Sequence, residues 1–297
     1  MASGNVMALP YPSPLTPHAV LKLGRFSLPL ERPLIMGVVN VTPDSFSDGG
    51  HFFDTRRAVE HARILIEEGA DILDIGGESS RPGAEPVGLD EELRRVMPVL
   101  EKLGALPVPV SVDTYKPEVM RRAIAAGAAM VNDINALRER AALEAVAESQ
   151  AAVCMVHMRG EPRTMQQDPH YEDVVSEVEA FLAKRVEAAQ HAGIGRDRIV
   201  IDPGFGFGKK TGHNLELLRG LPRIAGLGQP VLVGLSRKSL FGKITGKAAA
   251  DRVSASVAAA LRAAERGAAL VRVHDVAATR DALLVLNAIE RHYLVKN

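Results

Sequence analysis

The sequence predicts an α/β protein built as a (β/α)8 or TIM barrel, preceded by an N-terminal β-hairpin and a short flexible tail. Apolar runs of strand length alternate eight times with segments of helical periodicity. The 297 residues suffice for eight such units. No Gly-x-Gly-x-x-Gly follows the first predicted strand, which disfavours a doubly wound sheet. We therefore expect a flexible tail over residues 1–19 and a single domain over residues 20–297.

The elements follow in a regular order. The tail contains several prolines but neither a basic start nor a continuous apolar core, so we do not expect a secretory signal. Residues 20–30 alternate as a small hairpin that could close one end of the domain. Strands are predicted at residues 34–39, 71–76, 108–112, 129–132, 152–156, 198–201, 230–235 and 269–273. Helices are predicted at residues 56–68, 90–102, 117–126, 139–149, 171–192, 215–224, 249–266 and 277–292.

Residues at the predicted helix ends agree with this assignment. Gly69, Gly127, Gly193 and Gly267 fall one or two residues after predicted helices, where a left-handed cap is favoured. Pro117 stands where the third helix begins, and the first helical turn tolerates proline because its N–H groups have no partner within the helix. Local and global patterns therefore predict the same boundaries.

Composition narrows the possible functions. The 36 basic and 36 acidic residues cancel, so the charge gives no support for binding nucleic acid or an anionic membrane surface. At 46% hydrophobic residues the chain can bury a full-sized core, and no stretch is long and apolar enough to predict a membrane span. The single cysteine, Cys154, lies in an apolar run and cannot form an internal disulfide, which suits a reducing cytoplasm.

Chemically capable side chains follow all eight predicted strands, as a barrel enzyme requires. One of them alone could be a helix cap or a partner in a salt bridge. Eight in succession are better explained by one site at the carboxyl ends of the strands. In chain order they are Asn40, residues 78–81, Asp113, Asn132 with Asp133, His157, Asp202, Ser236 with Lys238, and Arg272 with His274.

Two of these strand ends carry polar side chains on one face. Because side chains alternate along a strand, Ser111 lies with Asp113, and Arg272 lies with His274. Barrels often bind phosphate around their last two units, so we expect a phosphate or diphosphate beside the Arg272 and His274 pair. A purely structural role for His274, as a core histidine with satisfied hydrogen bonds, is the alternative.

A polar loop follows the first predicted strand. Asn40 ends the strand, and residues 41–50 contain proline, aspartate, serine and paired glycine around one lone aromatic, Phe46. The placement of Phe46 suggests that its ring meets a ligand. A glycine-rich turn with capping side chains is the alternative.

A second glycine-rich loop spans residues 202–209. It resembles a phosphate-binding loop, but the spacing of the Walker motif fails. We interpret its glycines as allowing Phe205 or Phe207 to approach a planar ligand while Asp202 accepts hydrogen bonds from that ligand.

Two carboxylates and one amide at neighbouring strand ends favour a neutral heterocycle rich in N–H donors. The carboxylates of Asp113 and Asp202 accept hydrogen bonds only, whereas the amide of Asn132 offers both senses. A glycosidase with paired carboxylates is a competing interpretation, but it leaves the cations at the last strand ends without a role.

Metal ligands are sparse in the sequence. The nine histidines are scattered, and no Cys/His spacing suggests zinc. Magnesium could still enter with a diphosphate, held by the oxygen ligands of Asn40 or Asp44.

Seven motifs together resemble those of the dihydropteroate synthases. The resemblance runs from about residue 34 to the C-terminus, and its first and last motifs are highly specific. Ser80 departs from the family, which usually has threonine before the arginine. The motifs are Asn-Val-Thr-Pro-Asp-Ser-Phe-Ser-Asp-Gly-Gly at 40–50, Gly-Gly-Glu-Ser-Ser-Arg-Pro-Gly-Ala at 76–84, Ser-Val-Asp-Thr at 111–114, Val-Asn-Asp-Ile at 131–134, Asp-Pro-Gly-Phe-Gly-Phe-Gly-Lys at 202–209, Ser-Arg-Lys-Ser at 236–239 and Arg-Val-His-Asp-Val at 272–276.

The resemblance implies a transferase of folate biosynthesis. Such an enzyme condenses 6-hydroxymethyl-7,8-dihydropterin diphosphate with p-aminobenzoate to give 7,8-dihydropteroate and diphosphate. It uses Mg²⁺ as cofactor and small molecules as substrates, and we expect a cytoplasmic homodimer that binds neither nucleic acid nor membrane. Loops matching residues 41–50 and 79–83 would close over the site.

Roles for individual residues also come from the resemblance. Residues matching the pterin site are Asp113, Asn132, Asp202 and Lys238. Those matching the diphosphate site are Asn40, Ser80, Arg81, Arg272 and His274, and the metal would be held by Asn40 and Asp44. The p-aminobenzoate pocket matches Phe46, Pro82, Phe207 and Ser239. Catalysis would depend on Lys238, Arg272, His274 and Asp113.

Two other functions remain as alternatives. A pterin-dependent methyltransferase acting with a corrinoid protein would share the barrel and the pterin contacts, but has no use for a diphosphate loop at Asn40 or for Arg272 with His274. A non-catalytic paralogue would bind pterin for regulation, and it is disfavoured because every chemically capable position is filled. Release of diphosphate in the presence of both substrates would discriminate among the three.

Overall fold

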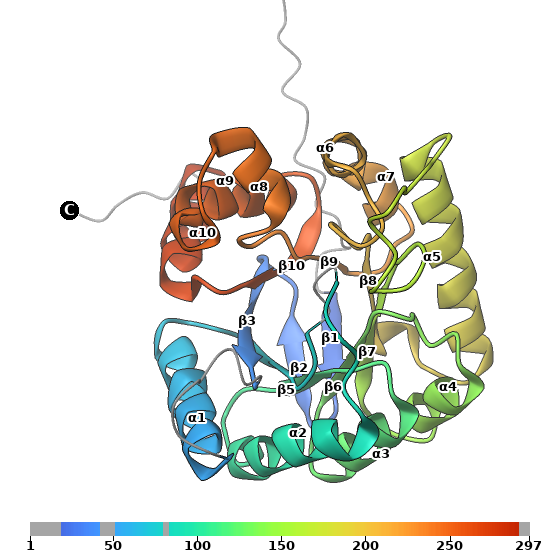
Figure 1. Ribbon diagram of the computed structural model, residues 1–297, viewed down its shortest axis with the longest axis vertical. Coiled ribbons are helices and arrows are strands. Elements are labelled where there is room, and N and C mark those ends of the chain that lie inside the picture. The colour runs from blue at the N-terminus through green and yellow to red at the C-terminus, as the bar shows by residue number, and fades with distance from the viewer. Residues whose placement is uncertain (1–18, 42–50, 80–82, 291–297) are drawn as a thin grey trace, which may run out of the picture.

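The computed structural model describes residues 19–41, 51–79 and 83–290, with the backbone alone for residues 51–54 and 290. Eight parallel strands close into a barrel, and helices surround it (Figure 1). The order around the barrel is β10-β3-β4-β5-β6-β7-β8-β9, so neighbours in sequence are neighbours in space. The predicted fold class is confirmed. The predicted tail lies outside the described residues except for Ala19.

The barrel strands lie where the apolar runs predict them, to within two residues at each end. Parallel strands covered on both sides are expected to be mostly apolar, and these are, with buried polar exceptions such as Asp74 and Ser111. The strands are β3 (Leu34–Asn40), β4 (Ile72–Gly76), β5 (Val110–Asp113), β6 (Met130–Asp133), β7 (Ala152–Val156), β8 (Ile199–Asp202), β9 (Val231–Val233) and β10 (Ala268–Val273).

Strand register brings the polar ends level with one another. Asn40 pairs with Gly76, Gly76 with Asp113, and Asp113 with Asn132, so four adjacent strands end in one row. Asp202 pairs with Val156 at the end of the next pair of strands. Side chains far apart in sequence therefore meet at the carboxyl rim of the barrel.

Alternation divides the strand side chains into two buried sets. One set faces the barrel interior and forms a cluster of its own, which includes Leu34, Met36, Ile72, Met130, Cys154, Val200, Leu232 and Leu270. The other set packs against the helices and includes Ile35, Leu73, Val131, Val153 and Ile201. Burying each large apolar side chain contributes about 1.5–3 kcal/mol, so both layers stabilise the barrel.

A hairpin closes the amino end of the barrel. Strands β1 (Val20–Leu23) and β2 (Phe26–Pro29) pair antiparallel, as predicted. Leu21 and Leu23 are fully buried and join the interior cluster. The turn is tied to loops that precede barrel strands, because the Gly24 N–H donates to the Gln150 carbonyl at 3.1 Å. The carboxyl end is left for the site.

The helices alternate with the strands as predicted. They are α1 (His51–Glu67), α2 (Leu89–Leu103), α3 (Pro117–Ala125), α4 (Arg140–Ala147), α5 (Val174–His191), α6 (Thr211–Arg219), α7 (Leu221–Ala225), α8 (Ser239–Thr245), α9 (Val253–Ala264) and α10 (Val276–Glu290), with short 3-10 turns η2 (Arg196–Arg198) and η3 (Ala249–Asp251). None of the helices in the described part of the chain combines the length and apolar character needed to cross a membrane.

Four helix predictions need correction. Helix α1 begins at His51, five residues before its predicted start at residue 56. The segment predicted as one helix at residues 215–224 is α6 and α7, because Pro222 cannot donate within a continuous helix. Helix α5 begins three residues later than predicted, since the Asp173 carboxylate accepts from the N–H groups of Val175 and Ser176, both at 3.0 Å. The segment predicted as a helix at residues 249–266 is a 3-10 turn followed by α9. Helix α8 was not predicted.

Candidate active site

The carboxyl rim gathers the predicted site residues that the structure describes. Asn40 ends β3, Asp113 ends β5 and Asp202 ends β8. Asn132 lies in β6 and Arg272 in β10, while His274 follows β10 directly and Lys238 lies in the loop after β9, immediately before α8. The predicted residues Asp44, Phe46, Ser80, Arg81 and Pro82 lie outside the described residues.

Arg272 links two strands of this rim through its guanidinium group. Its Nε donates to Asp74 Oδ2 at 2.6 Å and its Nη2 donates to Asp113 Oδ2 at 2.7 Å. Asn132 donates its amide hydrogen to the same Asp74 oxygen at 3.1 Å. Burial opposes the charge of Arg272, but the two carboxylates outweigh that effect and raise the pKa of its guanidinium. The guanidinium is therefore a fixed cation whose orientation is set from two sides.

Asp74 is a site residue that the sequence analysis missed. It is fully buried in the middle of β4, and its Oδ1 has no hydrogen-bond partner within the described residues. Two neighbours share this state, because Ser111 Oγ and Asn132 Oδ1 are likewise buried without a described partner. An acid inside an apolar strand run was the available signal, since buried charges are rare unless they are paired.

Asp113 titrates in an unusual range. Burial raises the pKa of its carboxyl group to about 7; Arg272 acts against the shift, while Asp74 and Glu92 add to it. A carboxyl group of this kind can hold or release a proton near neutral pH.

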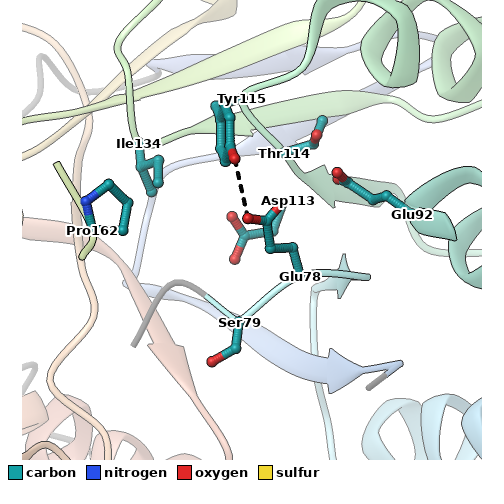
Figure 2. A pocket seen from close by; sticks show the side chains of 8 residues that line it. All are labelled: Glu78, Ser79, Glu92, Asp113, Thr114, Tyr115, Ile134 and Pro162. Atoms are coloured by element: carbon teal, nitrogen blue, oxygen red, sulfur yellow. Dashed lines mark hydrogen bonds between the residues drawn. The ribbon is translucent and has the colours of Figure 1, made fainter. Parts of the chain in front are cut away.

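A small pocket lies beside Asp113, and Figure 2 shows the side chains that line it. Tyr115 donates its hydroxyl hydrogen to Glu78 Oε1 at 3.1 Å. Lys116 forms ion pairs with Glu78 and with the buried Glu92, the latter at 2.5 Å. Glu78, which follows β4, is thus anchored beneath the residues where the predicted loop at 79–83 begins. The lining comprises Glu78, Ser79, Glu92, Asp113, Thr114, Tyr115, Ile134 and Pro162.

Asp202 is held by the loop that follows it. Its Oδ1 accepts from the Gly204 N–H at 2.6 Å, a short turn that glycine permits with a φ of +71°. Burial raises the pKa of the carboxyl group, against the effects of the Gly204 hydrogen bond and of Lys238. One oxygen is thus committed to the backbone, and the other is available as an acceptor.

Lys238 lies against the same loop. Its ammonium donates to the Phe205 carbonyl and lies 4.5 Å from the centre of the Phe207 ring. Burial lowers the pKa of this amine to about 8, although Asp202 favours its charged form. These contacts bring Lys238 to the same loop that holds Asp202, the other residue assigned with it to the pterin site.

The last strand ends carry the predicted anion-binding residues. His274 Nδ1 lies 3.0 Å from Ser236 Oγ, and the His274 N–H donates to the same oxygen at 3.2 Å. Arg237 has a positive φ of +55° and forms an ion pair with Asp275, which fixes the turn before α8. Ser239 is exposed at the start of α8.

The sequence model of the family described as "Pterin binding enzyme" matches residues 36–274. These bounds include the barrel strands, apart from the first two residues of β3, and the predicted site residues of the rim just described. The chain belongs to the pterin-binding enzyme family. The amide and carboxylates of its rim are the hydrogen-bonding groups that a pterin edge requires.

Relatives that match most of this chain include several dihydropteroate synthases. The chain is 47% identical to the dihydropteroate synthase of Escherichia coli K12 over 263 residues, 88% of this chain and 93% of the relative. A Xanthomonas albilineans dihydropteroate synthase solved with 4-aminobenzoic acid is 56% identical, with a TM-score of 0.87 over 92% of this chain and 98% of that one. The Burkholderia cenocepacia enzyme solved with 7,8-dihydropteroate is 52% identical, with a TM-score of 0.85 over 92% and 97%. The resemblance to the dihydropteroate synthases is confirmed, and so is the prediction of a transferase.

Proposed function

We propose that this pterin-binding enzyme condenses 6-hydroxymethyl-7,8-dihydropterin diphosphate with p-aminobenzoate at the carboxyl rim of its barrel. The observation that carries the proposal is the convergence of Asp113, Asn132, Asp202 and Lys238 on one rim around Arg272. Relatives more than half identical to the chain were solved with 4-aminobenzoic acid and with 7,8-dihydropteroate, one of the two substrates and the product of this reaction.

The pterin is assigned to the interior of the rim. Its N–H groups need acceptors, which the carboxylates of Asp113 and Asp202 supply, and its ring carbonyl and nitrogens need donors, which Asn132 and Lys238 supply. The buried Asn132 Oδ1 lacks a partner within the described residues, so a ligand donor there would satisfy it. Arg272, held flat by two carboxylates, would lie along one edge of the heterocycle.

The reaction moves few atoms. The bond between the pterin methylene carbon and the diphosphate oxygen breaks, the arylamine nitrogen bonds to that carbon, and the nitrogen then loses one proton. Charge develops mainly on the leaving diphosphate, so preorganised cations lower the barrier more than a general base would. Arg272 and His274 supply that stabilisation from the last strand, and the Ser236 hydroxyl orients the histidine ring.

Magnesium fits the donor set as a partner of the substrate rather than of the protein alone. Within the described residues no group of three or more acidic, histidine or cysteine side chains could hold a metal. Mg²⁺ commonly binds through one or two protein oxygens and the phosphates of a substrate, and Asn40 at the end of β3 is such an oxygen ligand. When bound, the ion would neutralise charge on the diphosphate.

The p-aminobenzoate is assigned to the outer side of the loop at residues 202–209. Phe207, whose ring packs on the Lys238 ammonium, would form a wall of this pocket, and Ser239 at the start of α8 would lie at its edge. Phe46 and Pro82 are proposed as further walls, by the sequence resemblance alone.

The direct test is release of diphosphate by the purified chain. With both substrates and Mg²⁺ present, we expect diphosphate and 7,8-dihydropteroate in equal amounts. Omission of either substrate should abolish dihydropteroate formation. Methyl transfer from a tetrahydrofolate without diphosphate release would instead support the methyltransferase alternative.

Lys238→Ala provides the matched variant for this assay. The variant should weaken the binding of both substrates. It removes the proposed hydrogen-bond donor to the pterin, and it also removes the ammonium against which the Phe207 ring packs. Unchanged turnover and unchanged substrate affinities would remove Lys238 from the site.

We also propose a cytoplasmic homodimer. Leu284, Val285 and Ile289 of α10 are more than half exposed, although apolar, and the buried Cys154 forms no disulfide. Exposed apolar groups on one helix favour association with a second copy. Light scattering should give twice the chain mass, and Val285→Glu should give the single mass if α10 forms the interface.

A further inference from the structure

Lys209 is a buried lysine that the proposed reaction does not use. It ends the glycine-rich loop and is only 3% exposed. Its ammonium donates to the carbonyls of Gly204 at 2.8 Å and Phe207 at 3.1 Å, and lies 2.9 Å from His157 Nδ1. These partners are uncharged, and no carboxylate of the described residues forms an ion pair with it. Burying an ammonium on neutral acceptors alone is costly, so the position calls for a purpose.

The partners of Lys209 belong to two loops that touch backbone to backbone. A Cβ on Gly204 would lie 1.8 Å from the His157 carbonyl oxygen, and one on Gly208 would lie 2.2 Å from that of Arg159. Both glycines have positive φ, +71° and +62°. Only glycine lets the loop after β8 approach the loop after β7 so closely, and Lys209 lies where the two loops meet.

Other donors complete the outer side of this contact. Tyr171 donates its hydroxyl hydrogen to the Gly208 carbonyl at 2.9 Å, and Gln166 donates to the Gly206 carbonyl at 2.6 Å. With the two bonds from Lys209, the carbonyls of residues 204, 206, 207 and 208 all have side-chain donors. The backbone of this loop is therefore held at four successive points.

His157 accepts in this contact when Lys209 is charged. Burial lowers the pKa of Lys209 well below that of a free lysine, and the group donates to the carbonyls of Gly204 and Phe207 in either protonation state. In its charged form Lys209 has no acceptor atom, so the short contact then requires a lone pair on His157 Nδ1 and places the ring hydrogen on Nε2. Burial, and next the charge of Lys209, lower the pKa of His157 to about 2, so the ring stays neutral. The Phe181 ring packs edge-on at 4.9 Å and fixes its orientation.

The inner side of the same loop carries the site. Asp202 bonds to the Gly204 N–H, and Phe207 packs on Lys238. Lys238 donates to the Phe205 carbonyl of this loop, and Lys209 donates to the neighbouring Gly204 carbonyl. The loop is thus held by two lysines, of which only Lys238 is assigned to the proposed substrate site.

We propose that Lys209 is a positioning residue for p-aminobenzoate, acting through Phe207: its ammonium fixes the loop backbone so that the Phe207 ring stands ready as a pocket wall. The proposal rests on the proposed function in assigning the aminobenzoate pocket to Phe207. Loss of the ammonium should loosen Phe207, while Asp202 keeps its place at the end of a barrel strand. The effect should therefore fall mainly on the second substrate.

The test compares Lys209→Met with Lys210→Met. Methionine keeps most of the length of lysine and removes its charge. Lys210 is the adjacent residue, but it is exposed, and its ammonium forms an ion pair with exposed Asp168 at 2.8 Å. We expect Lys209→Met to raise the KM for p-aminobenzoate about tenfold or more and the KM for the dihydropterin diphosphate less than about threefold. Lys210→Met should change neither.

A double-mutant cycle with Phe207→Ala shows whether Lys209 acts through that ring. In the Phe207→Ala background, Lys209→Met should raise the KM for p-aminobenzoate by less than about twofold, because the wall that it positions is gone. Additive effects in the cycle, or equal losses for both substrates, would overturn the proposal.

Hydrogen exchange separates this proposal from the proposed function. In Lys209→Met the amides of residues 203–208 should exchange faster than in the parent chain, and that readout needs no turnover. If the parent chain releases no diphosphate, the proposed function fails while the exchange result still reports on the loop. Lys209→Gln, which is shorter but keeps donors, serves as a second variant. If neither variant yields folded protein, or if exchange is unchanged, Lys209 is not a positioning residue.

Discussion

The barrel interior is lined by apolar side chains at its amino end and by charged and polar side chains at its carboxyl end. Leu270 and Arg272 lie two residues apart on β10, so both point inward. Leu270 is fully buried in the apolar cluster that the hairpin closes. Arg272 is bonded to two carboxylates at the other end. Apolar burial contributes to stability at any pH, whereas a buried charge cluster depends on the protonation of each member. The amino end therefore stabilises the fold, and the carboxyl end orders charges for a ligand.

Arg272→Met should break this division most strongly. It leaves the buried Asp74 without its cation, which costs about 3–5 kcal/mol in the free energy of unfolding at neutral pH. The loss should shrink in acid, where the carboxyl groups can become neutral. Urea unfolding at two pH values measures both effects.

Leu270→Ala is the matched change at the other end of the same strand. It should cost about 2–5 kcal/mol through the cavity that it creates, with little dependence on pH. If the two variants showed the same pH dependence, the contrast between the two ends would be wrong.

Asp113→Asn should change how the free energy of unfolding depends on pH. Burial raises the pKa of Asp113 to about 7 in the folded state, well above its unfolded value. The folded chain then binds more protons, so this group lowers stability as the pH rises from about 4 to about 7, by about 1 kcal/mol per unit. Asp133, with a pKa raised to about 6 by burial, acts in the same direction. The slope of the free energy of unfolding against pH across this range should therefore be more positive in Asp113→Asn than in the parent, and an identical slope would refute the shift.

The sequence predicts the two ends unequally well. Apolar runs and glycine caps locate every barrel strand within two residues, because each signal is local. Strand parity also predicts that Ser111 shares a face with Asp113, and that Arg272 shares one with His274. The sequence analysis did not predict Asp74 as the partner of Arg272. Asp74 lies 198 residues away in the sequence, and it stands inside an apolar strand run. The contacts of Lys209 were not predicted either, because backbone carbonyls leave no pattern in a sequence.

Asp202→Asn tests the ligand side of the rim. The amide presents a donor where the proposed pterin N–H edge needs an acceptor, which should weaken dihydropterin binding by about 1–3 kcal/mol, or roughly 5-fold to 150-fold. Asp133→Asn is the control, because Asp133 is equally buried at a strand end but its oxygens accept from the N–H groups of Asn135 and Leu137 instead. Calorimetry should show weaker binding for the first variant and parent affinity for the second. Equal affinities in both would remove Asp202 from the pterin site.

Ser111→Ala has the smallest expected effect. It tests whether the buried polar side chains of Asp74, Ser111 and Asn132 serve ligand binding or stability. Ser111 is fully buried beside Asp74 across the sheet, and its hydroxyl has no hydrogen-bond partner among the residues the structure describes. Removing an unpaired hydroxyl should leave the free energy of unfolding of the ligand-free chain within about 1 kcal/mol of the parent, in either direction. If these polar side chains serve ligand binding, the same change should weaken dihydropterin binding by about 1 kcal/mol, or roughly fivefold. Urea unfolding and calorimetry on one preparation measure both quantities. A loss of stability as large as that of Leu270→Ala, with binding unchanged, would mean that the polar residues at the carboxyl end support the fold as the apolar residues at the amino end do.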